Sequence, residues 1–116
     1  MKAVQFRLTT AEIGNDEVVL SLHGDVDLYT APELKAELIR LIEDGPKRII
    51  VDLTAATFID STTLGVLLGA LKRLRPAGGE LSIVCPDPNI RKIFQITLLD
   101  RVFSIFETRE NALDLY

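Results

Sequence analysis

The chain has 116 residues, the size of one domain with a single hydrophobic core, and residues 1–116 are expected to form that one domain. Apolar residues make up 47% of the chain and charged residues 26%, which excludes a largely disordered protein. The net charge of -4 has the wrong sign for attraction to phosphate backbones, so no nucleic acid is expected as a partner.

The N-terminal segment MKAVQFRLTT has no continuous apolar run of the kind that a secretion signal contains. No later stretch reaches the roughly 18 apolar residues that a membrane-spanning helix needs. The single cysteine, Cys85, cannot form an internal disulfide, which fits a reducing compartment. We therefore expect a cytoplasmic protein that makes no contact with a membrane.

The first two predicted elements are strands at 3–10 and 17–24, where apolar and β-branched residues are frequent. Gly14 and Asn15 lie between them and are typical turn residues. These two strands are expected to form an antiparallel hairpin.

A helix is expected over 28–45, with Thr30 as its N-cap, Pro32 in its first turn and Gly45 after its end. Four apolar residues recur there at helical spacing: Leu34, Leu38, Leu41 and Ile42.

The rest of the chain alternates strands with helices. Strands are predicted at 46–54, 80–85 and 101–107, and helices from within 60–63 to 75, at 88–96 and at 108–116. Residues 54–59 are read as a connector. Strands joined by crossover helices pair in parallel, and the hairpin makes the sheet mixed. The predicted fold is α/β, with a mixed sheet and about four packing helices.

The polar run Asp60, Ser61, Thr62 and Thr63 interrupts an otherwise apolar segment at the start of the second helix. Asp60 or Ser61 is the natural N-cap, because a short side-chain oxygen accepts a hydrogen bond from an unpaired backbone N–H. Capping requires only one of these four residues. A hydroxyl at this position also tolerates an added phosphate, since the helix dipole favours an anion there, so Ser61 is a chemically reasonable phosphoacceptor.

The same helix is expected to bury a stripe of leucines, which are Leu64, Leu67, Leu68, Leu71 and Leu74. Gly65 and Gly69 lie four residues apart within it, and each costs about 1 kcal/mol relative to alanine. We interpret them as a place of close approach, either by the sheet or by a partner.

The segment FIDSTTLGVLLGALKRLRPAGGELSIVCPDPNIRKIFQITLLDRVFSIFETRENAL resembles the STAS domain of bacterial anti-sigma factor antagonists. The likeness covers nearly the whole chain, since LHGDVDLYTAPEL resembles the Gly-Glu-Leu-Asp segment and first helix of that family. In the family, the pattern Asp-Ser-Ser/Thr-Gly-Leu-Gly follows the third strand, and its first serine is phosphorylated. That serine corresponds to Ser61, whereas Thr63 stands where glycine is usual.

The resemblance implies that the unmodified protein binds an anti-sigma factor with serine kinase activity and thereby frees a sigma factor. It also implies that phosphate on Ser61 switches the protein off and that a serine phosphatase restores it. No enzymatic activity, cofactor or metal is implied. The residues expected at the partner surface are Asp25, Asp27, Asp60, Ser61, Thr62, Thr63 and Gly65.

Four other residues have simpler interpretations. His23 is expected to be structural or exposed, and Cys85 to be a small core residue. Asp25 and Asp27 could face the same side of a strand end as a carboxylate pair, but further metal ligands of obvious spacing are missing, which favours solvated turn residues.

Two other classes of function remain open at this point. Ser61 could be a hydrolase nucleophile, but it lacks the Gly-x-Ser-x-Gly elbow, and His23 is the only candidate base. The chain could also be a STAS interaction subunit of another assembly, such as a stressosome or a transporter-associated complex, without a sigma factor switch.

Overall fold

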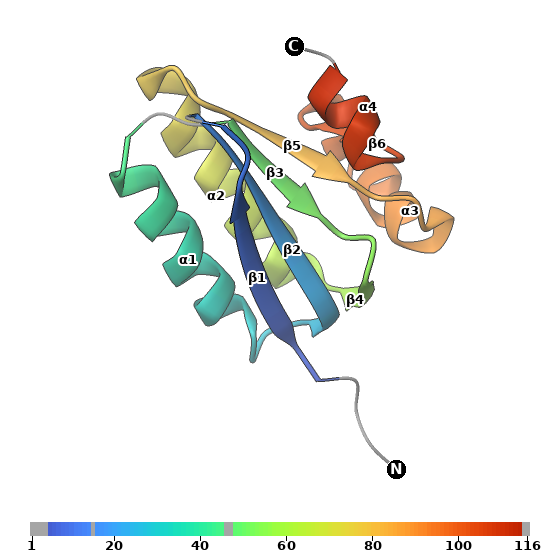
Figure 1. Cartoon of the computed structure of the whole chain (residues 1–116). Helices are drawn as coiled ribbons and strands as arrows, with labels where there is room; N and C mark the ends of the chain where they lie inside the picture. Colours follow the sequence, from blue (N-terminus) through green and yellow to red (C-terminus); the bar gives the residue numbers. More distant parts are fainter. Residues whose placement is uncertain (1–4, 15, 46–47, 115–116) are drawn as a thin grey trace.

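The computed structural model describes residues 5–14, 16–45 and 48–114, and in this part of the chain six strands form a mixed sheet (Figure 1). The strand order is β1-β2-β3-β5-β6, and β4 pairs with β2 outside this path. The strands are β1 (Arg7–Glu12), β2 (Glu17–Val26), β3 (Arg48–Asp52), β4 (Ala56–Ile59), β5 (Glu80–Val84) and β6 (Ser104–Phe106).

The predicted hairpin and parallel pairings are confirmed. β1 runs antiparallel to β2, with Leu8 opposite Leu22. The pairs β2–β3, β3–β5 and β5–β6 are all parallel. The residues at 3–4, 46–47 and 115–116, and the turn residue Asn15, lie outside the described part, so those ends of the predicted elements are not tested.

Helices cover the two faces of the sheet unequally. The helices are α1 (Ala31–Glu43), α2 (Ser61–Leu74), α3 (Pro88–Ile96) and α4 (Arg109–Asp114), with the short 3-10 turns η1 (Arg75–Ala77) and η2 (Leu99–Arg101). α1 and α2 lie side by side on one face, while α4 lies on the other (Figure 1). None of the helices in the described ranges is long and apolar enough to cross a bilayer.

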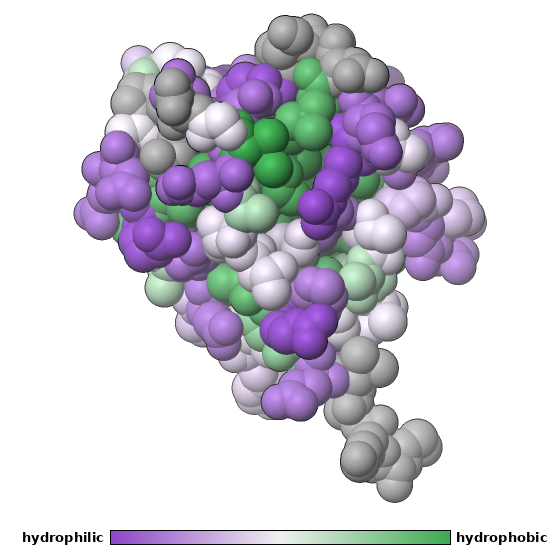
Figure 2. All heavy atoms as spheres, viewed as in Figure 1, coloured by the Kyte–Doolittle hydropathy of each residue, from purple (hydrophilic) through white to green (hydrophobic). Residues whose placement is uncertain are grey.

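Alternation along the strands divides the core into two layers. Leu20 of β2 and Val51 of β3 belong to the large cluster that contains the buried leucines of α1 and α2. Val19 and Ile50, one residue earlier in each strand, belong to a small cluster with Ala112 of α4. Figure 2 shows the face with α4, where hydrophobic side chains gather in the upper part and hydrophilic ones surround them. The central strands therefore bury apolar side chains on both faces, as their continuous apolar runs indicate.

The sequence does not predict β4, because the segment 54–59 has the pattern of a connector. Only Ala56 and Ile59 of this strand are buried, and such a short element gives no clear alternation in the sequence. β4 pairs in parallel with the end of β2, with Ile59 opposite Val26, after a register shift at Gly24/Asp25. The end of the long strand β2, from Gly24 to Val26, thus pairs with a strand that directly precedes the polar run.

One local expectation is wrong, and another is met only in part. Leu68 was placed in the buried stripe of α2, but it is only partly buried, whereas Leu67 is 0% exposed. Thr30 occupies the N-cap position of α1, yet its hydroxyl makes no capping bond. That hydroxyl accepts a hydrogen bond from the backbone N–H of Asp27 instead, at 2.8 Å.

Candidate functional site

The polar run forms the end of β4 and the first turn of α2. Asp60 is the N-cap, in an extended conformation, and its carboxylate accepts a hydrogen bond from the backbone N–H of Thr63 at 3.0 Å. The choice between Asp60 and Ser61 as cap is thereby settled in favour of Asp60. Ser61 and Thr62 are exposed at the first two helical positions. Within the described part of the chain, the Ser61 hydroxyl has no hydrogen-bond partner.

Thr63 is different from its two neighbours because its side chain is buried, at 0% exposure. Its hydroxyl donates a hydrogen bond to the backbone carbonyl of Val26 at 2.9 Å and also lies 3.0 Å from the Asp60 carboxylate. The first turn of α2 is therefore bonded to the end of β2. Thr63, which is one of the residues expected at the partner surface, is buried here and holds the start of α2 against β2.

The two predicted surface carboxylates, Asp25 and Asp27, make separate contacts. Asp25 accepts a hydrogen bond from the Thr57 hydroxyl at 2.6 Å, which links β2 to β4. Asp27 accepts backbone N–H bonds from Tyr29 at 2.9 Å and from Thr30 at 3.2 Å. Each carboxylate thus shapes the connection in which it lies. No group of three or more histidine, cysteine, aspartate or glutamate side chains within the described ranges could hold a metal ion.

Exposed apolar side chains accompany these polar residues, and sequence reasoning did not single them out. Leu28 and Tyr29 follow β2 and are 61% and 86% exposed, and Phe58 of β4 is 48% exposed. Phe58 lies opposite Asp25 in the β2–β4 pairing, and Leu28 and Tyr29 come shortly after β2 ends at Val26. Large exposed apolar side chains that gather in one region are typical of a protein-binding surface. The available signal was an apolar pair inside the polar segment DVDLYT.

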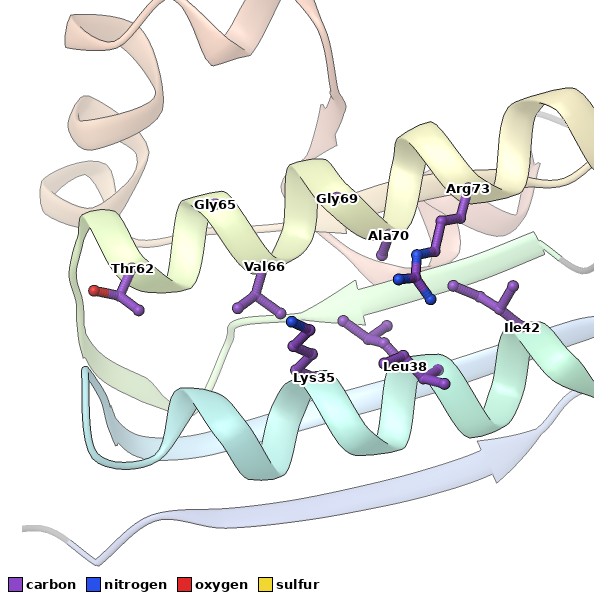
Figure 3. A pocket seen from close by; sticks show the side chains of 10 residues that line it. Lys35, Leu38, Ile42, Thr62, Gly65, Val66, Gly69, Ala70 and Arg73 are labelled. Carbon is purple, nitrogen blue, oxygen red and sulfur yellow. The ribbon is translucent and has the colours of Figure 1, made fainter.

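Gly65 and Gly69 lie on the exposed side of α2, and a Cβ atom built on either one meets no other atom within 4 Å. Close approach by the sheet, one of the two explanations considered for them, is therefore wrong. Both glycines border an open groove between α1 and α2 with a volume of about 320 Å³ (Figure 3). The apolar residues of this groove are Leu38, Ile39, Ile42, Val66 and Ala70.

The remaining singled-out residues lie away from the polar run. The ring Nδ1 of His23 is 3.5 Å from the guanidinium of Arg7, and His23 forms no hydrogen bond with Ser61 in the described structure. Cys85 is fully buried, as predicted, and burial raises the pKa of its thiol to about 11. The thiol therefore stays protonated at neutral pH.

A second polar cluster joins α4 to the sheet on the opposite face. The buried Asp52 carboxylate is 2.5 Å from Nε of Arg109, and the same guanidinium donates to the Ser21 hydroxyl at 2.7 Å. Burial alone would raise the pKa of Asp52, but hydrogen bonds from Thr54 and Arg109 outweigh it and hold this pKa below its usual value. Residues 57 positions apart form this contact, which no local sequence pattern reveals.

Comparison with known proteins fits this geometry. The family profile of the STAS domain matches residues 7–112. The "Anti-sigma-B factor antagonist" of Staphylococcus aureus is 37% identical over 87 residues, which are 75% of this chain and 81% of that protein.

Solved structures of two relatives share the fold. An anti-sigma factor antagonist from Mycobacterium paratuberculosis has a TM-score of 0.88 and 26% identity, covering 96% of this chain and 93% of the other. SpoIIAA, described as a Bacillus cell fate determinant, is 27% identical in both of its forms. Its unphosphorylated form gives a TM-score of 0.81, covering 93% and 94% of the two chains. Its phosphorylated form gives 0.74, covering 93% and 97%. The chain belongs to the STAS domain family.

Proposed function

We propose that the chain is an anti-sigma factor antagonist, which binds an anti-sigma factor with serine kinase activity and thereby releases a sigma factor. Phosphate on Ser61 switches this binding off, and a serine phosphatase restores it. The protein acts in the cytoplasm as a binding module without catalytic activity, and it contacts neither nucleic acid nor a membrane. The relatives named above, which are themselves described as anti-sigma factor antagonists, support the proposal.

The observation that carries the proposal is the different burial of three adjacent hydroxyl groups. Thr63 is fully buried and hydrogen-bonded, whereas Ser61 is exposed in the first turn of α2 and its hydroxyl has no hydrogen-bond partner within the described residues. A kinase can reach Ser61 without unfolding the domain. A phosphate at this position also lies near the positive end of the helix dipole, which favours an anion by typically 0.3 to 1 kcal/mol.

The switch follows from charge at the interface. A phosphoserine adds roughly -1.5 to -2 charges. It would arrive next to Asp60 and at the same end of the sheet as Asp25 and Asp27. A partner surface that receives a neutral hydroxyl in a desolvated contact has no compensation for this charge. Burying it should cost on the order of 2 to 5 kcal/mol, or about thirty-fold to several thousand-fold in affinity.

The modification is tested by incubating the chain with its cognate anti-sigma factor kinase and ATP, followed by phosphopeptide mass spectrometry. One phosphate is expected on Ser61, and Ser61→Ala should abolish it. Thr62→Ala is the matched control, because Thr62 is the exposed neighbour, and it should still be phosphorylated. Phosphate on Thr62 in the parent chain would contradict the assignment.

The switch is tested by titration calorimetry with the same anti-sigma factor at moderate salt. Ser61→Asp should weaken binding measurably and Ser61→Ala should preserve it, both with circular dichroism spectra like that of the parent. Equal affinity of the Asp variant and the parent would refute charge exclusion. If the chain binds no anti-sigma factor at all, the alternative function as an interaction subunit of another regulatory or transporter-associated complex takes its place.

A further inference from the structure

The two glycines of α2 leave part of that helix without side chains on its outer surface. Gly65 and Gly69 are one helical turn apart and exposed, and the space beside each is open for at least 4 Å. In an exposed helix, alanine would be more stable at each position by about 1 kcal/mol. Packing within the described part of the chain gives no reason for glycine at either position. An absent side chain does allow another backbone to approach α2 closely.

The groove beside these glycines has an apolar interior and two cationic side chains. Lys35 extends from α1 and Arg73 from α2, and both reach over the groove (Figure 3). Neither forms an ion pair with any described residue, and no carboxylate lines the groove. This region is therefore positive on a chain whose net charge is -4. An occupant with acidic groups and an apolar face would complement it.

The dimensions of the groove fit a helix. It follows α2 from Thr62 to Arg73, which at 1.5 Å per residue is about 16 Å, or three turns. Its apolar lining comes from two helices that lie side by side, which is the usual setting for an amphipathic helix bound in a groove. Thr62, at one end of the groove, directly follows Ser61. A partner bound at Ser61 can therefore extend along α2 without leaving the surface.

We propose that the groove between α1 and α2 receives an acidic amphipathic helix of the anti-sigma factor, which packs closely against Gly65 and Gly69 and pairs its carboxylates with Lys35 and Arg73. This inference rests on the proposed function and extends the partner surface from the phosphorylation site along the outer side of α2. The groove contributes affinity that phosphate on Ser61 does not directly remove.

The test is titration calorimetry of the recombinant anti-sigma factor with two groove variants. Gly69→Leu fills the groove, and the open space at Gly69 lets the variant fold, which a melting curve checks. Arg73→Glu reverses one of the two charges. Each variant should bind the anti-sigma factor about ten-fold more weakly or worse, as expected for removal of a central contact.

Matched controls separate the groove from general effects. Lys72→Glu makes the same change of charge in the neighbouring residue, which lies at the same end of α2 but outside the groove. It therefore reproduces the effect of Arg73→Glu on the net charge and on the interaction with the helix dipole. Ala36→Leu adds a leucine to the exposed surface of α1, also outside the groove. Both controls should bind within about two-fold of the parent, because surface changes away from the interface are nearly neutral.

The outcomes are distinct. If the parent binds the anti-sigma factor and either groove variant binds equally well, the helix-in-groove inference is overturned while the proposed function stands. If the parent binds no anti-sigma factor, the proposed function fails and this inference fails with it. Titration with dodecanoate tests whether a small amphiphile occupies the groove instead. The inference would be refuted if the parent binds dodecanoate saturably and Arg73→Glu abolishes that binding but still binds the anti-sigma factor as tightly as the parent does.

Discussion

Thr63 provides a direct test of how the first turn of α2 is held in place. Thr63→Val keeps the shape and the β-branch of the side chain but removes the hydroxyl that donates to the Val26 carbonyl. Thr62→Val makes the same chemical change at the exposed neighbouring position. The pair therefore compares one buried and one exposed hydroxyl in the same turn of the same helix.

The expected difference follows from burial. The Thr63 side chain is 0% exposed, so water cannot replace its hydroxyl. Removing the hydroxyl takes a hydrogen bond from the Val26 carbonyl, and leaving a buried polar group without its partner costs about 1 to 3 kcal/mol. The whole domain is expected to have a stability of about 5 to 15 kcal/mol. At about 4 °C per kcal/mol for a domain of this size, Thr63→Val should lower the melting temperature by about 4 to 12 °C. Thr62→Val should stay within about 0.5 kcal/mol of the parent.

Urea denaturation of the three proteins, followed by circular dichroism, measures this difference. Thr63→Val should have a lower midpoint with an unchanged slope, because the surface exposed on unfolding does not change. Coinciding midpoints for Thr63→Val and Thr62→Val would show that the bond to β2 contributes nothing to stability. Our account of this helix start would then be wrong.

Three further predictions concern the rest of the domain. Gly69→Ala should raise the free energy of unfolding by up to about 1 kcal/mol, because alanine favours the helix and its Cβ meets no neighbour; a lower denaturation midpoint would contradict the open space at this position. Leu67→Ala should cost about 2 to 5 kcal/mol and Leu68→Ala clearly less, since only the first is fully buried; equal losses in urea denaturation would refute this orientation of α2. The pKa of Asp52 is lowered in the folded state, so its pairing with Arg109 stabilises the fold at pH values above the unfolded-state pKa of about 3.9. This stabilisation is lost as the pH falls through the folded-state pKa. As the pH falls below about 4, the parent should therefore lose more stability than Asp52→Asn; parallel pH profiles in stepped denaturation experiments would contradict this prediction.

The parts of the fold that could be predicted are those with a strong local pattern. The central strands have continuous apolar runs, and α1 and α2 have leucines at helical spacing, so their existence and type followed from the sequence. β4 has only two buried residues in four, and pairing with a strand thirty residues earlier is what makes it a strand. Its formation depends on tertiary contacts that no short window of sequence contains.

In the candidate site, too, the sequence predicts the features that follow local rules and misses those that depend on tertiary contacts. Helix-start chemistry identified Asp60 and Ser61, because caps obey local rules. The burial of Thr63 could not be foreseen, because it depends on where the end of β2 lies relative to α2. The two glycines of α2 indicate a close approach to this helix, but the sequence does not say whether the sheet or a partner approaches. The open space beside Gly65 in the structure excludes the sheet.

The short strand β4 limits how a kinase could recognise Ser61, the phosphate acceptor that we propose. Ile59 pairs with Val26, and Ser61, two residues later, is the first residue of α2, so the proposed acceptor is fixed in a helix that directly follows a strand. A kinase that accepts extended peptides would have to break both elements to draw Ser61 into its cleft. The kinase would then recognise the folded surface, which includes side chains from distant parts of the chain. The local sequence around Ser61 would not be sufficient for recognition. A loosened β4 would weaken recognition even where every residue next to the serine is intact.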